Sequence, residues 1–276
     1  MSSWLHGIIL GVVQGLTEFF PVSSSGHLVL VPVLFGWPDQ GLVFDTVLHL
    51  GTLVALLIFF GSDLHSLLQR VLHSDPVVSR HARRFVAQVG VATLPALIIG
   101  FLTKDLIETI FRGWKIVVFD LVLWSFVLWY ADHHRQRVVN DGPSIEQLSW
   151  KQILLIGFAQ PLALFPGTSR SGMTITAGLF VGLSRETAAR FSFFLSIPIT
   201  MAAGGYGLLR VIKEGLGPQD SLGMLFAGFL AAVIAGTWAI RFLLSYVAKK
   251  PFTLFVIYRL ALASLMLCVQ WFCRCF

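Results

Sequence analysis

Charged residues are scarce in this 276-residue sequence, in which 12% of the residues are Asp, Glu, Lys or Arg and 56% are hydrophobic. Soluble domains carry about 25% charged residues, because a charged surface keeps them in solution. The low charge therefore excludes a water-soluble globular domain. The apolar residues form runs of roughly 17 to 25 residues, the length of helix that crosses a bilayer. We therefore expect an all-α polytopic membrane protein.

Cysteine is also scarce, and all three cysteines lie at the C-terminal end, at Cys268, Cys273 and Cys275. Their spacing contains no CxxC pair, which excludes a disulfide framework and a structural zinc site. The net charge of +6 does not indicate a nucleic-acid partner. The basic residues fall in short loops between apolar runs, where anionic lipid headgroups attract them. We expect membrane lipids, and no nucleic acid, around the chain.

Ten apolar segments follow one another along the chain, and they differ in length. Six are long enough to cross a bilayer: 43–60, 84–102, 115–131, 187–209, 222–247 and 252–272. Four are too short or too interrupted: 4–20, 28–37, 151–166 and 172–183. We therefore predict about six full transmembrane helices and two pairs of short helices.

Each short pair is interrupted by a polar break, from Pro21 to His27 in the first pair and from Pro166 to Gly172 in the second. Within a bilayer, irregular backbone is tolerated only where protein or a wet cavity surrounds it, because each unsatisfied amide costs several kcal/mol. Both pairs should therefore be re-entrant helical hairpins whose breaks point into the protein.

The two breaks are similar to each other. Aligning Gly11–His27 with Gly157–Met173 gives identities at Gly11/Gly157, Gln14/Gln160, Leu16/Leu162, Phe19/Phe165, Ser23/Ser169, Ser25/Ser171 and Gly26/Gly172. Three long spans follow each hairpin, so the second copy would lie inverted in the membrane. We predict one membrane domain built of two inverted repeats, 1–131 and 150–276, joined by a cytoplasmic loop, 132–149. Chance similarity of two Gly- and Ser-rich breaks is the alternative.

Basic residues are distributed unequally between the loops of the two predicted faces. One face would hold the loops around 61–83, 132–151, 184–190 and 248–251. Its eleven basic residues are Arg70, Arg80, Arg83, Arg84, Arg135, Arg137, Lys151, Arg185, Arg190, Lys249 and Lys250. The other face would carry six: Lys104, Arg112, Lys115, Arg210, Lys213 and Arg274. The excess predicts that the first face is cytoplasmic and that both termini lie outside.

The first break combines a carboxylate with hydroxyls and an imidazole. Gln14 and Glu18 are four residues apart and share a helix face. A carboxylate inside an apolar helix costs about 2.5–3.5 kcal/mol, so Glu18 needs compensation. The residues Ser23, Ser24, Ser25 and His27 follow within the break. This cluster favours a reaction site, and the alternative is that Glu18 caps the opposite hairpin or pairs with Arg170.

The second break has the composition of an anion-binding site. Arg170 lies among Thr168, Ser169, Ser171 and Thr174, just before a predicted helix. A guanidinium matches phosphate oxygens, and a helix N-terminus adds free N–H groups. A structural Arg170–Glu18 pair is again the alternative.

Together these residues predict a phosphoryl-transfer site between the breaks. Arg170 would neutralise the phosphate oxygens, a Ser hydroxyl would attack phosphorus, and His27 or Glu18 would move the proton. Asp45 and His49 share a helix face and would either line the same cavity or form hydrogen bonds inside the bundle. Arg259 should extend to the headgroups. An inverted repeat with broken helices is also typical of transporters, so a transporter that flips a phosphate-bearing lipid is the alternative function.

Both breaks resemble the motifs of the bacterial undecaprenyl-diphosphate phosphatase family, which is associated with bacitracin resistance. One family motif has Glu or Gln, then Glu four residues later, followed by Pro-Val-Ser-Ser-Thr-Gly-His, and it resembles Gln14–His27. The other, Pro-Gly-x-Ser-Arg-Ser-Gly with a later Thr, resembles Pro166–Thr174. The resemblance implies removal of the terminal phosphate of undecaprenyl diphosphate, which recycles the lipid carrier of peptidoglycan synthesis. It also implies the bacterial inner membrane and a site that opens to the outer face.

The resemblance implies catalytic roles for Glu18, Ser24, His27 and Arg170. The residues expected to bind substrate are Gln14, Ser23, Ser25, Thr168, Ser169, Ser171 and Thr174. The family implies Mg²⁺ or Ca²⁺, for which Glu18 and Asp45 are the candidate ligands, but no tightly bound cofactor. The chain departs from the motif because Gln14 replaces a frequent Glu and Ser25 replaces the usual Thr, which leaves open which hydroxyl attacks. A homodimer is also left open.

Overall fold

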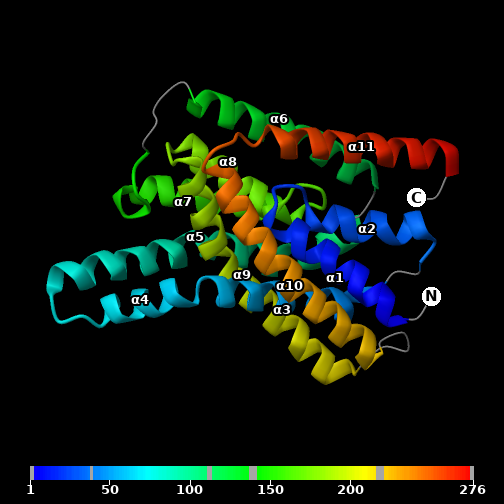
Figure 1. Ribbon diagram of the computed structural model, residues 1–276, viewed down its shortest axis with the longest axis horizontal. Helices are drawn as coiled ribbons and strands as arrows, with labels where there is room; N and C mark the ends of the chain where they lie inside the picture. Colours follow the sequence, from blue (N-terminus) through cyan, green and yellow to red (C-terminus); the bar gives the residue numbers. More distant parts are fainter. Residues whose placement is uncertain (1–2, 38–39, 111–113, 137–141, 216–220, 274–276) are drawn as a thin grey trace.

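The computed structural model describes residues 3–37, 40–110, 114–136, 142–215 and 221–273, and these residues form helices and connecting turns without a strand (Figure 1). In chain order the elements are α1 (Ser3–Phe19), α2 (Ser24–Phe35), α3 (Gly41–Phe59), α4 (Gly61–Val71), α5 (Pro76–Ile110), α6 (Trp114–Gln136), the 3₁₀ turn η1 (Ile145–Gln147), α7 (Trp150–Ala159), the 3₁₀ turn η2 (Gln160–Leu164), α8 (Arg170–Phe180), α9 (Arg185–Glu214), α10 (Leu222–Val247) and α11 (Thr253–Cys273).

The long helices confirm the prediction of a multi-pass membrane protein. Among the described residues, five helices are long and apolar enough to cross a bilayer: α5, α6, α9, α10 and α11. The predicted span 43–60 corresponds to α3, which continues into α4 with a bend of 65°. Counting this bent pair as one span gives up to six crossings.

The segment 61–83, which we expected to be a loop, is largely helical. It contains α4 and the first part of α5, and α4 has no buried residue. The segment was mistaken for a loop because its polar residues lie on a helix that extends beyond the apolar part of the protein. Figure 1 shows α4 and the start of α5 projecting from one end of the molecule.

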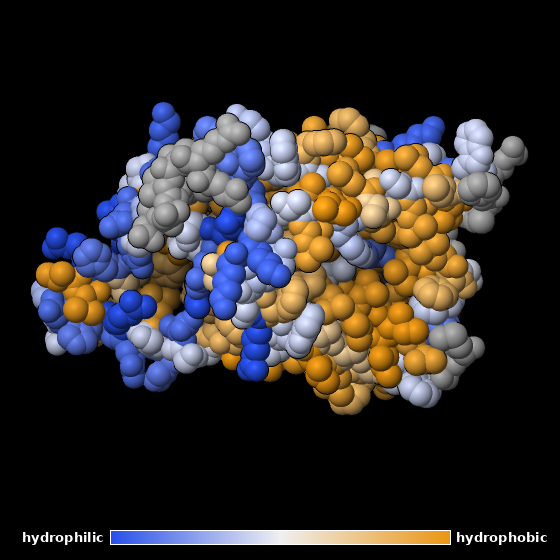
Figure 2. Space-filling model, turned by 45° about the horizontal axis from the view of Figure 1, so that its top comes forward, coloured by the Kyte–Doolittle hydropathy of each residue, from blue (hydrophilic) through white to orange (hydrophobic). Residues whose placement is uncertain are grey.

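The polar and apolar surfaces lie toward opposite ends of the molecule. In Figure 1 both termini lie at the right, and the α4–α5 connection lies at the far left. Figure 2 shows hydrophilic side chains over the left part and a broad hydrophobic area over the right part. This separation fits a chain that is largely embedded in lipid and extends a polar end into water.

Glycines allow the short helices to pack closely against long ones. A Cβ built on Gly11 of α1 would lie 2.3 Å from the carbonyl oxygen of Gly228 on α10. One built on Gly157 of α7 would lie 2.9 Å from the carbonyl oxygen of Ala92 on α5. Small residues permit such close helix contact inside membranes.

The two short pairs have corresponding partners. α1 packs against α10, and α7 packs against α5, which are equivalent helices under the predicted repeat. In Figure 1, α1 and α2 enter from the right, α7 and α8 lie toward the left, and the breaks meet near the centre. This arrangement is what an inverted repeat would produce, and the repeat boundaries 1–131 and 150–276 stay a prediction.

A cluster of aromatic rings lies beside the breaks. Phe19, Phe60 and Phe193 are almost fully buried, and the rings of Phe19 and Phe193 meet edge to face with centroids 5.5 Å apart. Edge-to-face contact suits the ring quadrupoles and adds to the apolar burial. All three rings belong to the largest hydrophobic cluster of the bundle.

Candidate active site

The two breaks have the same local backbone structure. Ser23 and Ser169 both have positive φ angles, of 73° and 76°, which a residue with a side chain rarely adopts. The Ser23 hydroxyl accepts from the N–H of Gly26 at 3.3 Å, and the Ser169 hydroxyl accepts from that of Gly172 at 3.2 Å. Each serine therefore lies directly before a helix and caps its N-terminus.

The irregular stretches are shorter than we predicted. α2 begins at Ser24, so Ser24, Ser25 and His27 lie in the first turn of a helix and not in irregular backbone. α8 likewise begins at Arg170. Both helices therefore begin within the breaks, and a helix N-terminus favours an anion close to it.

An ion pair joins the two breaks. One terminal nitrogen of Arg170, Nη2, donates to Oε1 of Glu18 at 2.6 Å. The other, Nη1, donates to the hydroxyl of Ser196 on α9. The Glu18 side chain is 6% exposed and that of Arg170 is 16% exposed. A pair this buried is held by direct charge-assisted hydrogen bonds, because little water screens it.

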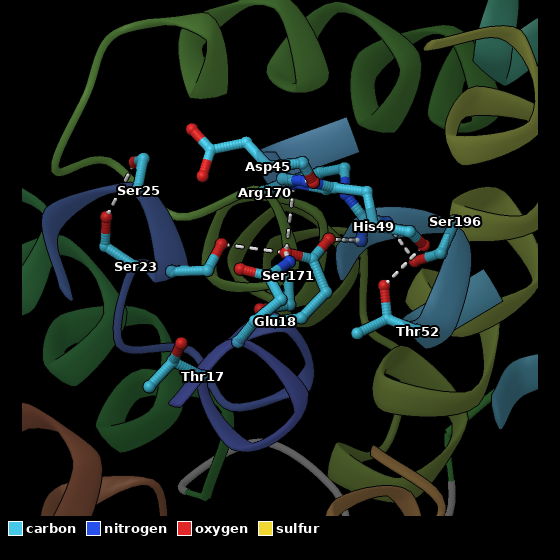
Figure 3. A network of polar contacts seen from close by, with 12 residues as sticks. Thr17, Glu18, Ser23, Ser25, Asp45, His49, Thr52, Arg170, Ser171 and Ser196 are labelled. Carbon is cyan, nitrogen blue, oxygen red and sulfur yellow. Dashed lines mark hydrogen bonds and ion pairs between the residues drawn. The ribbon is translucent and has the colours of Figure 1, made fainter. Parts of the chain in front are cut away.

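Three further polar groups lie close to the second carboxylate oxygen of Glu18, Oε2 (Figure 3). Oε2 accepts from the Ser24 hydroxyl at 2.7 Å and from Nε2 of Gln14 at 3.0 Å. Nε2 of His49 on α3 lies 3.7 Å from the same oxygen. The other ring nitrogen of His49 is 2.8 Å from the Asp45 carbonyl oxygen. His49 thus belongs to the site, one of the two placements that the sequence left open.

Hydroxyls from both breaks complete the cluster. Ser171 donates to the Phe20 carbonyl at 3.0 Å, and Gly167 N–H lies 3.5 Å from the Ser25 hydroxyl. Thr174 instead donates to the Ser192 hydroxyl at 2.6 Å. The structure therefore places Ser171 and Ser25 between the breaks, while Thr174 packs into the bundle beside α9.

His27 has partners outside the Glu18 cluster. Its Nδ1 is 2.7 Å from the Ser23 carbonyl oxygen, and its Nε2 is 2.7 Å from the Tyr258 hydroxyl on α11. The imidazole and the Tyr258 ring are stacked with an interplanar angle of 5°. The sequence placed His27 beside Ser24, but in the structure both ring nitrogens are engaged elsewhere.

The sequence, with both breaks included, matches a known family over nearly its whole length. The sequence model described as "Bacitracin resistance protein BacA" matches residues 7–265. The chain belongs to this family. A protein of Chloroherpeton thalassium named undecaprenyl-diphosphatase is 41% identical over 270 residues, covering 95% of each chain. A protein of Idiomarina loihiensis with the same name is 42% identical over 266 residues, covering 94% of this chain and 96% of its own.

The family resemblance raised the question of a divalent cation, and the side chains here do not form a protein-only site for one. No group of three or more His, Cys, Asp or Glu side chains comes together within the described residues. Glu18 already accepts from Arg170, Ser24 and Gln14, and Asp45 accepts from Gln40 Nε2 at 3.3 Å. Mg²⁺ and Ca²⁺ need six or more oxygen ligands, so these carboxylates alone do not fit them.

Arg259 was expected to extend to the headgroups, and this expectation is wrong. Its side chain is fully buried, at 0% exposure, and contacts carbonyl groups of both breaks. Its place in the middle of the apolar run 252–272 was the signal for this, because a charged residue there has to face the bundle interior.

Proposed function

We propose that this member of the family is an undecaprenyl-diphosphatase, which uses water to convert undecaprenyl diphosphate to undecaprenyl phosphate and inorganic phosphate. The contact of Ser24 and Arg170 with the same carboxylate, Glu18, carries this proposal. It places the nucleophile, Ser24, and the phosphate-binding cation, Arg170, each one hydrogen bond away from the same proton acceptor, Glu18. The names of the relatives agree with it.

The terminal phosphate would bind against Arg170 and the start of α8. Nη1 and Nη2 each use one hydrogen in the free protein, so the guanidinium keeps N–H groups for phosphate oxygens. The neighbouring residues Gln14, Ser23, Ser25, Thr168, Ser169, Ser171 and Thr174 are proposed to bind or shape the site around the phosphate. Ser25 is the most accessible of the three serines of the first break.

The reaction would proceed in two balanced steps. In the first step, the Ser24 oxygen attacks the terminal phosphorus while its proton moves to Glu18, 2.7 Å away. The bond between phosphorus and the bridging oxygen then breaks, and undecaprenyl phosphate leaves with the electron pair. In the second step, water attacks the phosphoserine, the proton held by Glu18 returns to the Ser24 oxygen as its bond to phosphorus breaks, and both protons of the water leave with inorganic phosphate. Arg170 stabilises the charge on the phosphate oxygens in both steps.

Among the imidazoles, His49 is the better placed to exchange a proton with Glu18. Its Nε2 lies 3.7 Å from the carboxylate, and its side chain is 36% exposed. His27 would serve the proton transfer only through Tyr258 or after its ring moves, because both its nitrogens are engaged. The motif resemblance supports a role for His27 in proton transfer.

The same proposal implies the membrane in which the protein lies and the face to which its site opens. The chain is a multi-pass membrane protein, and we propose that it lies in the bacterial inner membrane with its site open to the outer face, where it recycles the carrier lipid of peptidoglycan synthesis. A homodimer and a requirement for Mg²⁺ or Ca²⁺ remain proposals. No step above passes through a metal, and such an ion would be held mainly by substrate phosphates.

The test is phosphate release by purified protein in detergent with undecaprenyl diphosphate, assayed beside farnesyl diphosphate. The proposal predicts stoichiometric release of one phosphate per lipid. A polyprenyl-phosphate carrier would release none, and would instead move lipid phosphate across proteoliposome membranes.

A further inference from the structure

The guanidinium of Arg259 is fully engaged inside the bundle. It lies on α11, which packs against α6 (Figure 1). Its Nε donates to the Ser125 hydroxyl at 3.0 Å and approaches the Leu121 carbonyl at 3.4 Å, both on α6. Nη2 donates to a third α6 group, the Asp120 carbonyl, at 3.2 Å. One side of the fork is thus fixed to a long helix.

The remaining N–H groups of Arg259 bind the two breaks. Nη1 donates to the carbonyls of Pro21 at 3.2 Å and Thr168 at 3.0 Å. Nη2 donates to the carbonyl of Gly167 at 3.1 Å. One side chain therefore holds the first and the second break at the same time, from the side of α6 and α11.

These carbonyls stand next to the proposed reacting residues. Pro21 lies between Phe20, whose carbonyl accepts from Ser171, and the turn at Ser23 that leads into Ser24. Gly167 and Thr168 lie directly before Ser169 and Arg170. A shift of any of these carbonyls would therefore displace Ser24 or Arg170, which lie two or three residues further along the backbone.

The geometry requires a guanidinium and not only a positive charge. Arginine has five N–H donors in a fixed plane, and here they reach six oxygen atoms. A lysine ammonium has three donors, so at least one break or α6 would lose its partner. Buried carbonyls without a donor are costly in an apolar bundle.

We propose that Arg259 is a positioning residue for the phosphatase reaction: it fixes the two breaks against each other so that Ser24 and Arg170 face one phosphoryl group. This inference rests on the proposed function. Arg259 itself lies behind the breaks and does not contact the carboxylate of Glu18, so its effect should appear in turnover and not in substrate capture.

The experiment compares Arg259→Lys with Arg241→Lys, a control on α10 whose side chain is exposed. We expect kcat of Arg259→Lys to fall by about 10²-fold, since a displacement of about 1 Å has that effect, with KM nearly unchanged. Arg241→Lys should keep wild-type kcat. Thermal unfolding of each purified variant in detergent reports the folded fraction.

Ser125→Ala provides a milder variant, in case Arg259→Lys does not fold. It removes the hydroxyl that Nε donates to and touches neither break, so kcat should fall several-fold in the same direction, again at nearly constant KM. Wild-type kcat in either folded variant would overturn the proposal, as would a rise in KM at constant kcat. Activity that falls only in proportion to the folded fraction would overturn it too.

The two proposals fail in different ways. If Ser24→Ala and Arg170→Ala are inactive while folded Arg259→Lys is fully active, only the positioning role is wrong. If Ser24→Ala and Arg170→Ala keep their activity, the proposed reaction site is wrong, whatever Arg259→Lys does.

Discussion

Glu18 and Arg170 are 152 positions apart in the sequence, yet their side chains form a hydrogen-bonded ion pair of 2.6 Å at the place where the two breaks meet. A carboxylate in an apolar helix needs a compensating charge, and Arg170 provides it for Glu18. It was also the alternative, purely structural interpretation of both residues. The Ser24 hydroxyl also donates to this carboxylate, so under the proposed function Glu18 can accept the proton of the attacking serine.

The Glu18–Arg170 pair should be strongly coupled in stability. Arg170→Gln leaves a buried carboxylate without its cation, and we expect the free energy of unfolding to fall by about 3–5 kcal/mol. The double variant Glu18→Gln, Arg170→Gln should lose clearly less than the sum of the two single variants. Thermal unfolding in detergent measures this. Strict additivity would show that the two side chains do not interact in the folded protein.

The attacking hydroxyl can be identified by comparing adjacent serines. Ser24→Ala should lower kcat by at least about 10³-fold, because it removes the nucleophile that donates to Glu18. Ser25→Ala is the matched control, and we expect a much smaller loss because its hydroxyl contacts Ser23 and Gly167. The reverse order of effects would move the attack to Ser25, and equal activity of Ser24→Ala and wild type would move it to another hydroxyl or to water.

The two serines with positive φ should respond to substitution in the same way. At Ser23 and Ser169, Ala loses the capping hydroxyl and keeps the strain of a Cβ at positive φ, whereas Gly loses the cap but relieves that strain. We therefore expect Ser→Gly to be more stable than Ser→Ala by about 1 kcal/mol at each position. Unfolding midpoints of the four variants test this. An Ala variant as stable as its Gly counterpart would argue against the backbone conformation.

The close helix contacts predict which glycines are essential for packing. Gly11→Ala and Gly157→Ala force a methyl group onto a backbone carbonyl and should destabilise the protein by about 1–3 kcal/mol each. Gly90→Ala is the control, because a Cβ there meets no atom within 4 Å. If all three substitutions had the same effect on the unfolding midpoint, the α1–α10 and α7–α5 contacts would not be as close as described.

His27 should reveal any part in proton transfer through the pH dependence of the rate. If it exchanges a proton, His27→Ala flattens one limb of the pH–rate profile. Tyr258→Phe removes the partner of Nε2 and should change the same limb to a smaller extent. Profiles of both variants parallel to the wild type would leave proton transfer to Glu18 and His49.

Much of the fold could be predicted from the sequence, because hydrophobic length is the main determinant of a helix in lipid. The predicted span 222–247 coincides with α10, and the other long spans lie within a few residues of their helices, except that α5 begins well before 84. The polar 61–83 was mistaken for a loop, since apolar runs do not report a helix that extends into water. In the structure α4 packs against α5.

The candidate site could be predicted in composition and in part of its contacts. Motifs and the internal repeat brought Glu18, Ser24 and Arg170 together correctly. Proximity in sequence misplaced His27, because the first turn of α2 points its ring toward Tyr258 on α11. No local pattern could show that Ser196 contacts Arg170 or that Arg259 binds both breaks, because those contacts depend on how distant helices pack.

The most direct measurement is phosphate release from undecaprenyl diphosphate by the wild-type protein beside Arg170→Ala and Ser24→Ala, each purified in detergent and shown to be folded by its unfolding midpoint. We predict steady release by the wild type and almost none by either variant. Release at the wild-type rate by both folded variants, or no release by the wild type, would contradict a reaction site formed between the two breaks.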